Sequence, residues 1–270
     1  MKLYWSISKK MYILRNDIYQ NRKKIISFCL GAVAYTLLLT YFWTLFSDTF
    51  GQMLDLFPDA VKAIAGFGDD LSVTGFLNGE FMHLIGPLII GAFGITIGSS
   101  SIATEEGNKT IDQILTLSIS RTRFYIEKYL ALVFCILLLA IIFSITLGIG
   151  SLVFNFDISL INLLYAAIAL FSFGLCNGSI SFSIGAITGK RSIAASITAF
   201  IAITGYVFDS IYTVVDKLDF TRYIALHYYY NSNAVIQNGV NSLHILVISL
   251  LIIISFIIGL YVFYQRDIKS

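Results

Sequence analysis

Hydrophobic residues are concentrated in six long stretches of the chain, and polar segments separate them. Each stretch holds about 20 residues or more, which as a helix is long enough to cross the hydrocarbon core of a bilayer. The pattern therefore predicts an all-α polytopic membrane protein with six transmembrane helices, over residues 25–46, 82–103, 128–150, 160–188, 193–214 and 243–264.

The composition agrees with a membrane protein and excludes a soluble one. Of 270 residues, 57% are hydrophobic and 13% are charged, whereas soluble proteins carry about 25% charged residues. A soluble globule of this size could not bury so much apolar surface. We expect residues 25–270 to form one transmembrane domain.

Lys and Arg are distributed unequally between alternate connecting segments. Fifteen lie in residues 1–24, 104–128, 190–191 and 266–269, and only three lie in the other connections. Because positive charge is retained on the cytoplasmic side, the distribution predicts a multi-pass protein of the cell membrane with both termini in the cytoplasm.

The basic N-terminal segment, residues 1–24, carries an apolar stripe at helical spacing. The stripe consists of Leu3, Ile7, Met11, Leu14 and Ile18, at steps of four, four, three and four residues. This pattern is typical of an amphipathic helix that lies in the headgroup plane. A basic anchor without a mechanical role explains the same residues equally well.

Two further features concern packing. The first outer segment, residues 47–81, is rich in Phe and Leu and broken by Gly, and it could be an extracellular lid or a packed cap that closes a dimer. Gly94 and Gly98 in the second span, with Gly174 and Gly178 in the fourth, provide small faces that allow close helix approach in lipid.

Residues 104–123 form the longest polar insertion on the basic side. Thr110 and Gln113 have the spacing of a capping box. Ile111, Ile114 and Leu115 then repeat at helical spacing. We predict a short amphipathic helix of about two turns, which is marginal alone and must be held by the flanking spans or by a partner.

The segment contains, in order, Glu105-Glu106-Gly107, Thr110, Ile114-Leu115, Ser120-Arg121 and then Lys128. In these residues it resembles the cytoplasmic coupling segment of permease subunits of the type-2 ATP-binding-cassette (ABC-2) exporter family. The sequence departs from the family pattern at Ser118, where the family usually has Pro, and at Asn108-Lys109, which lengthen the step from Gly to Thr.

The resemblance implies a permease that pairs with a second permease chain, identical or different, and docks on a separate ABC ATPase subunit. It implies polar contacts with the ATPase from Glu105, Glu106 and Arg121, and an apolar seat from Ile111, Ile114 and Leu115. The implied coupling residues are Glu105, Glu106, Gly107, Thr110, Ile111, Ile114, Leu115, Ser120 and Arg121. It also favours contact between the ATPase and the N-terminal helix.

The chain lacks signs of chemistry of its own. The run from Gly185 to Ser192 has three residues between its glycines instead of the four of a P-loop, and Arg191 stands where Ser or Thr must meet Mg²⁺. We therefore expect no catalytic residues and no bound cofactor, with ATP and Mg²⁺ on the partner. His83 and His244 lack the spacing of metal motifs, so no metal site is expected either.

The spans lack ionisable residues near their middle, which argues against an ion channel or a proton-coupled antiporter. An uncharged interior favours export of an apolar or amphipathic cargo, such as an antibiotic or a peptide. The alternative is a non-transporting membrane scaffold or sensor that recruits a cytoplasmic partner. Nucleic acid is not an expected partner.

Overall fold

The computed structural model describes residues 11–58, 61–62, 65–67, 71–111, 119–212, 215–231 and 234–266. Every regular element within these ranges is a helix. The elements are α2 (Tyr12–Phe46), α3 (Phe50–Asp55), α5 (Val73–Phe76), the π-helix η1 (Leu77–Ile85), α6 (Gly86–Ser101), α7 (Ala103–Gly107), α9 (Arg121–Phe154), α10 (Leu160–Thr188), α11 (Arg191–Tyr212), the 3₁₀-helix η2 (Asp216–Tyr223), α12 (Leu226–Asn231), α13 (Val235–Asn238) and α14 (Ser242–Gln265).

Six helical segments, one of which joins several consecutive elements, are long and apolar enough to cross a membrane, which confirms the predicted all-α architecture. The fourth span, Leu160–Thr188, has the predicted bounds. The second begins at Val73 instead of residue 82, and the third at Arg121 instead of residue 128. The prediction followed apolar composition, but a helix continues through polar residues where neighbouring elements pair with them.

The first span begins earlier than expected. The sequence suggested a break near residue 24, but α2 is one helix of 35 residues. No Gly or Pro lies between Tyr12 and Leu30 to end it. At 1.5 Å per residue the helix is about 52 Å long, which exceeds a hydrocarbon core of about 30 Å. The helix is therefore longer than a hydrocarbon core, and part of it lies outside that core.

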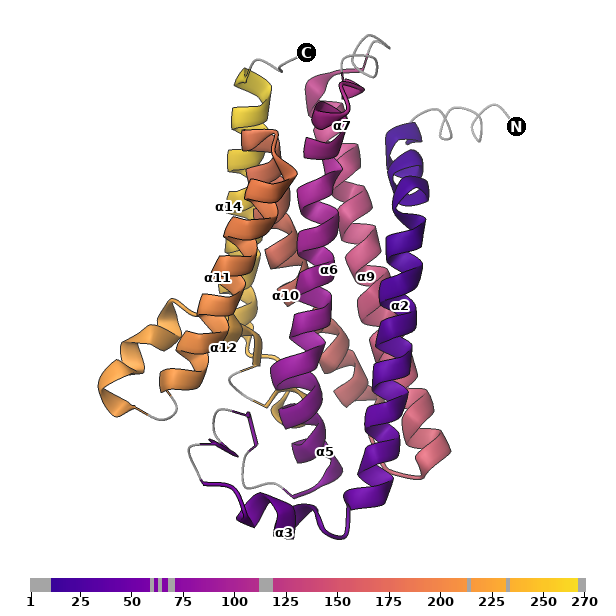
Figure 1. Cartoon of the computed structure of the whole chain (residues 1–270), viewed down its shortest axis with the longest axis vertical. Coiled ribbons are helices and arrows are strands. Elements are labelled where there is room, and N and C mark those ends of the chain that lie inside the picture. The colour runs from indigo at the N-terminus through magenta and orange to yellow at the C-terminus, as the bar shows by residue number, and fades with distance from the viewer. Residues whose placement is uncertain are drawn as a thin grey trace.

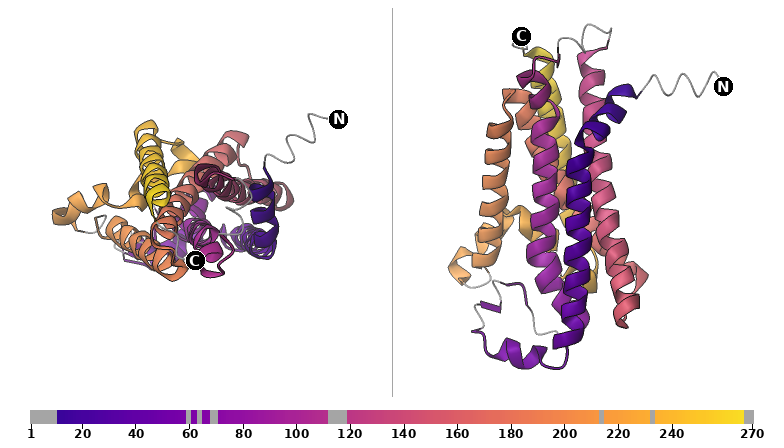
Figure 2. Two further views of the ribbon diagram at one scale, coloured as in Figure 1. Left: turned by 90° about the horizontal axis from the view of Figure 1, so that it is seen from above. Right: turned by 45° about the vertical axis from the view of Figure 1, so that its right-hand side comes forward.

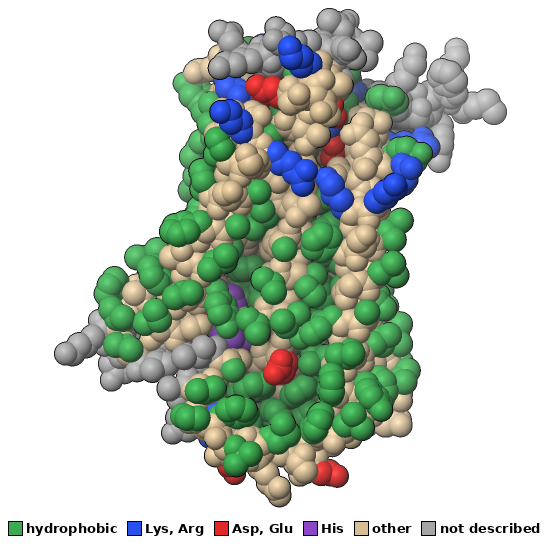
Figure 3. Space-filling model, viewed as in Figure 1, with side chains coloured by type: hydrophobic (Ala, Val, Ile, Leu, Met, Phe, Trp, Pro, Cys, Tyr) green, Lys and Arg blue, Asp and Glu red, His purple; other side chains and the backbone are tan. Residues whose placement is uncertain are grey.

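The spans form an elongated bundle with α6 and α10 at its centre (Figure 1). The α2 and α9 helices pack together on one side, and α11 and α14 lie on the other side (Figures 1 and 2). The start of α2, the end of α14 and α7 all lie at one end of the bundle. We call it the basic end, because Lys and Arg side chains gather there (Figure 3).

The central pair of helices meets at glycines, as the sequence predicts. A Cβ atom on Gly94 of α6 would lie 2.4 Å from the carbonyl oxygen of Gly174, and one on Gly98 would lie 2.4 Å from that of Gly178. Both distances are far below van der Waals contact. Glycine is therefore required for this backbone-to-backbone approach.

At the opposite end, the described part of the outer segment packs against the bundle. Phe50 of α3 contacts Trp43 of the first span, with ring centroids 5.7 Å apart, and Phe76 of α5 at 5.4 Å. Phe67 lies 5.7 Å from Phe50. Residues 73–81, which the sequence analysis assigned to the loop, are helical and extend the second span. The roles as a lid or as a dimer cap stay predictions.

Candidate functional site

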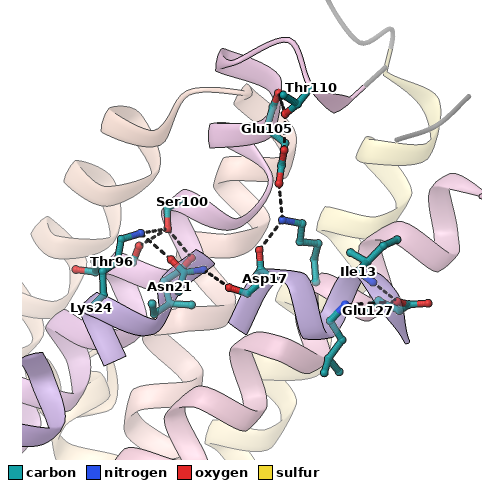
Figure 4. A network of polar contacts seen from close by, with 12 residues as sticks. Ile13, Asp17, Asn21, Lys24, Thr96, Ser100, Glu105, Thr110 and Glu127 are labelled. Atoms are coloured by element: carbon teal, nitrogen blue, oxygen red, sulfur yellow. Dashed lines mark hydrogen bonds and ion pairs between the residues drawn. The ribbon is translucent and has the colours of Figure 1, made fainter. Parts of the chain in front are cut away.

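A buried lysine joins three helices at the basic end. Lys128 of α9 is 2% exposed, and its Nζ atom lies 2.5 Å from Oδ1 of Asp17 in α2 and 3.0 Å from Oε1 of Glu105 in α7 (Figure 4). Both carboxylates are also buried. An ammonium group has three donors, so one lysine can hold both acids. Each acid makes the buried charge tolerable, since an unpaired one would be strongly destabilising.

The Glu105 carboxylate also fixes the start of the predicted coupling helix. The Thr110 hydroxyl donates to this carboxylate and, at 3.1 Å, to the Glu105 carbonyl oxygen. Lys109, which lies between Glu105 and Thr110 in the sequence, has a φ angle of 57°, so the chain turns there and not at Gly107. Ile111 follows and is 1% exposed. The first residues of the coupling segment are thus held against the bundle.

The same polar network continues along α2 to the second span. The Asn21 side chain donates to the carbonyl oxygen of Asp17 at 3.0 Å. Lys24 donates to Oδ1 of Asn21 at 2.8 Å and to the hydroxyl of Ser100 in α6 at 3.1 Å (Figure 4). The polar face of α2 is therefore the face that contacts its neighbours at this level.

Glu127, next to Lys128 in α9, caps the N-terminus of α2. Its Oε2 atom accepts hydrogen bonds from the backbone N–H groups of Ile13 at 3.1 Å and Leu14 at 3.5 Å. Its Oε1 atom pairs with Nε of Arg123 at 2.7 Å. A carboxylate at a helix N-terminus satisfies free N–H groups and complements the helix dipole. Met11, at the N-cap position, makes no such side-chain bond.

A second set of contacts attaches the segment to the end of the last span. Glu106 pairs with Arg266, directly after α14. Its carboxyl group lies over Gly189, the C-cap of α10, where an added Cβ would be 2.6 Å away. Arg121, at the start of α9, donates to the carbonyl oxygens of Arg266 at 2.7 Å and Tyr264 at 3.3 Å. A cation at a helix C-terminus is favourable for the helix dipole.

The structure shows intramolecular contacts for some of the predicted coupling residues, whereas others lie outside the described residues. Glu105, Glu106, Thr110 and Arg121 have partners within the chain. Ser120 accepts from the N–H of Arg123 at 3.2 Å and caps α9. Gly107 ends α7, with open space around it. Ile114, Leu115 and the capping-box partner Gln113 lie outside the described residues.

The predicted apolar stripe of the N-terminal segment is not the face that α2 buries. Met11 is exposed, and Leu14 and Ile18 are half-buried, while Leu3 and Ile7 lie outside the described residues. The buried positions are instead Ile13, Asp17, Asn21 and Ile25, at steps of four residues. Whether this segment lies in the headgroup plane is still a prediction.

Sequence reasoning missed Asp17, Glu127 and Arg266. An acid within a basic amphipathic segment, and a Glu-Lys pair at the start of a span, were the available signals. Neither identifies a partner, because the partners of Lys128 are 111 and 23 residues away along the chain.

Comparison with known proteins adds one match. A family model described as "ABC-2 family transporter protein" matches residues 60–264. This range contains Glu105, Lys128 and five of the six spans, whereas Asp17 precedes it. No curated protein matches the chain.

Proposed function

From the premise that the chain belongs to the ABC-2 family of membrane transporter proteins, we propose that it is the permease subunit of an ATP-driven exporter. In this proposal a separate ABC ATPase binds the coupling segment, residues 104–123, from the cytoplasm. Two permease chains pair in the membrane, and both termini of each lie on the ATPase side.

One observation carries the proposal: ion pairs and hydrogen bonds attach both ends of the coupling segment to the bundle. At the start of the segment, Glu105 connects to α2 and α9 through Lys128. Glu106 connects to Arg266 after α14 and lies over the end of α10. Near the end of the segment, Arg121 binds the end of α14. A displacement of residues 112–118 would therefore be transmitted to several spans together.

These contacts refine the roles of the predicted residues. Ile111 is buried within the chain, so we assign the apolar ATPase seat to Ile114 and Leu115. Glu105, Glu106 and Arg121 transmit the movement, because their partners are in the permease. The interaction surface and the transmission are therefore separate functions of neighbouring residues, and they can be tested separately.

The cargo is proposed on chemistry alone. Few charged side chains appear along the middle of the face seen in Figure 3, and most of the buried side chains are aliphatic or aromatic. Such an interior suits an apolar or amphipathic molecule, such as an antibiotic or a peptide. The direction, outward from the cell, follows the resemblance to exporters.

The test compares Ile114→Asp with Glu105→Gln. The chain is co-expressed with an ABC ATPase encoded next to its gene, and co-purification and permease-stimulated ATP hydrolysis are measured. Ile114→Asp should abolish co-purification, because it places a charge in the apolar seat. Glu105→Gln should retain the ATPase but lose most of the stimulation, because the ion pair with Lys128 is removed while the docking surface is intact.

Asp157→Asn is the matched control, since Asp157 is an exposed acid in the connection between α9 and α10 at the opposite end. It should leave both readouts unchanged. Undiminished co-purification of Ile114→Asp would refute the assigned seat. Co-purification without any stimulation of ATP hydrolysis by the wild-type chain would favour the non-transporting scaffold instead.

A further inference from the structure

A buried polar cluster lies far from the coupling segment, towards the opposite end of the bundle. It consists of His83 in η1, Asp209 in α11 and His227 in α12, all less than 9% exposed. Each residue offers one ligand atom, and these atoms all lie within 4.8 Å of one another. Three elements that are separate in sequence therefore converge on one point.

The orientation of His227 has a specific cause. Pro87, at the start of α6, has no N–H group and cannot donate to the carbonyl oxygen four residues earlier, which belongs to His83. The Nε2 atom of His227 lies 2.8 Å from that oxygen. Because a carbonyl only accepts, Nε2 carries the proton. Nδ1 therefore points at Asp209, whose Oδ2 atom is 2.5 Å away.

This arrangement is the one that metal-binding histidines use. Such a histidine usually donates its second ring N–H to a carbonyl or carboxylate, which fixes the ring and directs the other nitrogen to the metal. The His83 ring stands at 88° to the His227 ring, with centroids 4.9 Å apart. The outer segment covers His83, since a Cβ on Gly66 would lie 2.3 Å from its ring.

The donor set also selects the class of metal. Two imidazoles and one carboxylate suit Zn²⁺ and its first-row neighbours, whereas Mg²⁺ and Ca²⁺ prefer oxygen ligands throughout. Three protein ligands leave a position for water or another small donor. A cavity of about 220 Å³ between α6, α10 and α11 is lined by His227 and Tyr206 and otherwise by apolar residues. Histidine atoms are visible between α6 and α11 in Figure 3.

We propose that His83, Asp209 and His227 form a binding site for a Zn²⁺-class transition metal ion, which ties the outer parts of the second and fifth spans to α12. The ion replaces the proton between Nδ1 of His227 and Oδ2 of Asp209, and this proton is released to water. This site goes beyond the proposed transport function and does not depend on an ATPase. It also differs from the expectation, based on motif spacing, that the chain has no metal site.

The test uses the full-length chain in detergent, without a polyhistidine tag and after removal of metals with a chelator. Co²⁺ is titrated while its visible d–d absorption is recorded, because Zn²⁺ itself has none. We expect one Co²⁺ per chain, displaced by Zn²⁺, and a Zn²⁺-dependent rise in Tm. His83→Gln and His227→Gln should each weaken Co²⁺ binding by at least about tenfold.

His244→Gln is the matched control, since His244 is the third of the three histidines and its ring packs on Tyr228 and Tyr229 outside the cluster. It should bind Co²⁺ like the wild type. If His227→Gln does not fold, His83→Gln decides, because the Nε2 bond of His227 uses only the backbone of residue 83. Absence of Co²⁺ absorption, or unchanged binding by His83→Gln, would overturn the proposal.

Discussion

Replacement of Lys128 by Met gives the strongest test of the ionic network. Methionine has nearly the length of lysine but lacks its charge, so packing is largely kept while the cation is lost. Asp17 and Glu105 would then face each other in a buried site. We expect a large loss of stability, because each carboxylate would keep its desolvation penalty without its partner.

The magnitude follows from the geometry. The distances of 2.5 Å and 3.0 Å from Nζ place the two carboxylate oxygens at most 5.5 Å apart. At that separation two like charges repel by about 3 kcal/mol, with an effective dielectric constant of about 20. Removing one partner of a buried ion pair costs about 3–5 kcal/mol. Both routes predict a loss of about 3–5 kcal/mol for Lys128→Met.

The assay is unfolding of the purified chain in mixed micelles by SDS titration, followed by tryptophan fluorescence. Trp43 packs against Phe50 and Phe76 and reports loss of the folded bundle. Glu105→Gln in the Lys128→Met background should restore about 2–3 kcal/mol, because it removes the repulsion. Lys23→Met changes an exposed lysine of α2 and should stay within about 0.5 kcal/mol of the wild type.

The reasoning fails if Lys128→Met unfolds within about 1 kcal/mol of the wild type. It also fails if Glu105→Gln adds to the damage of Lys128→Met instead of offsetting it. Either result would mean that the two carboxylates do not share the lysine in the folded chain.

Two further predictions concern the bundle and its orientation. Gly94→Ala places a Cβ 2.4 Å from a backbone oxygen of α10 and should lower the free energy of unfolding by about 1–3 kcal/mol. Gly31→Ala is the control and should not lower it, because a Cβ there has nothing within 4 Å. Equal effects of the two changes in SDS titration would contradict the close packing of α6 and α10. For orientation, single cysteines are placed at Asp157 or Lys190 in a chain without its three native cysteines. The cysteine at Asp157 should react with an impermeant maleimide in intact cells, and the one at Lys190 only after permeabilisation. The reverse labelling would place the coupling segment outside the cell.

Much of the fold follows from the sequence, because a bilayer imposes a simple requirement. Each span must be a helix of sufficient length, since the backbone has no other partners in lipid. Run length therefore predicted six spans, and the glycines of the second and fourth spans predicted the close approach that Gly94 and Gly174 make. The coupling segment stays a prediction, which rests on a pattern of residues within the continuous stretch 105–128.

The sequence could not determine which polar residues are buried against neighbouring helices. The apolar stripe with Leu14 predicted a helix in the headgroup plane and gave no sign that α2 buries Asp17, which pairs with Lys128. A buried charge is strongly destabilising unless an opposite charge lies beside it. The partner comes from another helix, and the packing and rotation of the helices decide which residue it is.

The histidine cluster shows the same limit. His83 and His227 are 144 residues apart and have no motif spacing. They meet because η1 and α12 pack at the same level of the bundle. The apolar runs thus determined which segments are helices, and the distribution of Lys and Arg predicts the side of the membrane on which each connection lies. Only the tertiary structure decided which charged and histidine side chains meet, because such contacts depend on how whole helices are placed against one another.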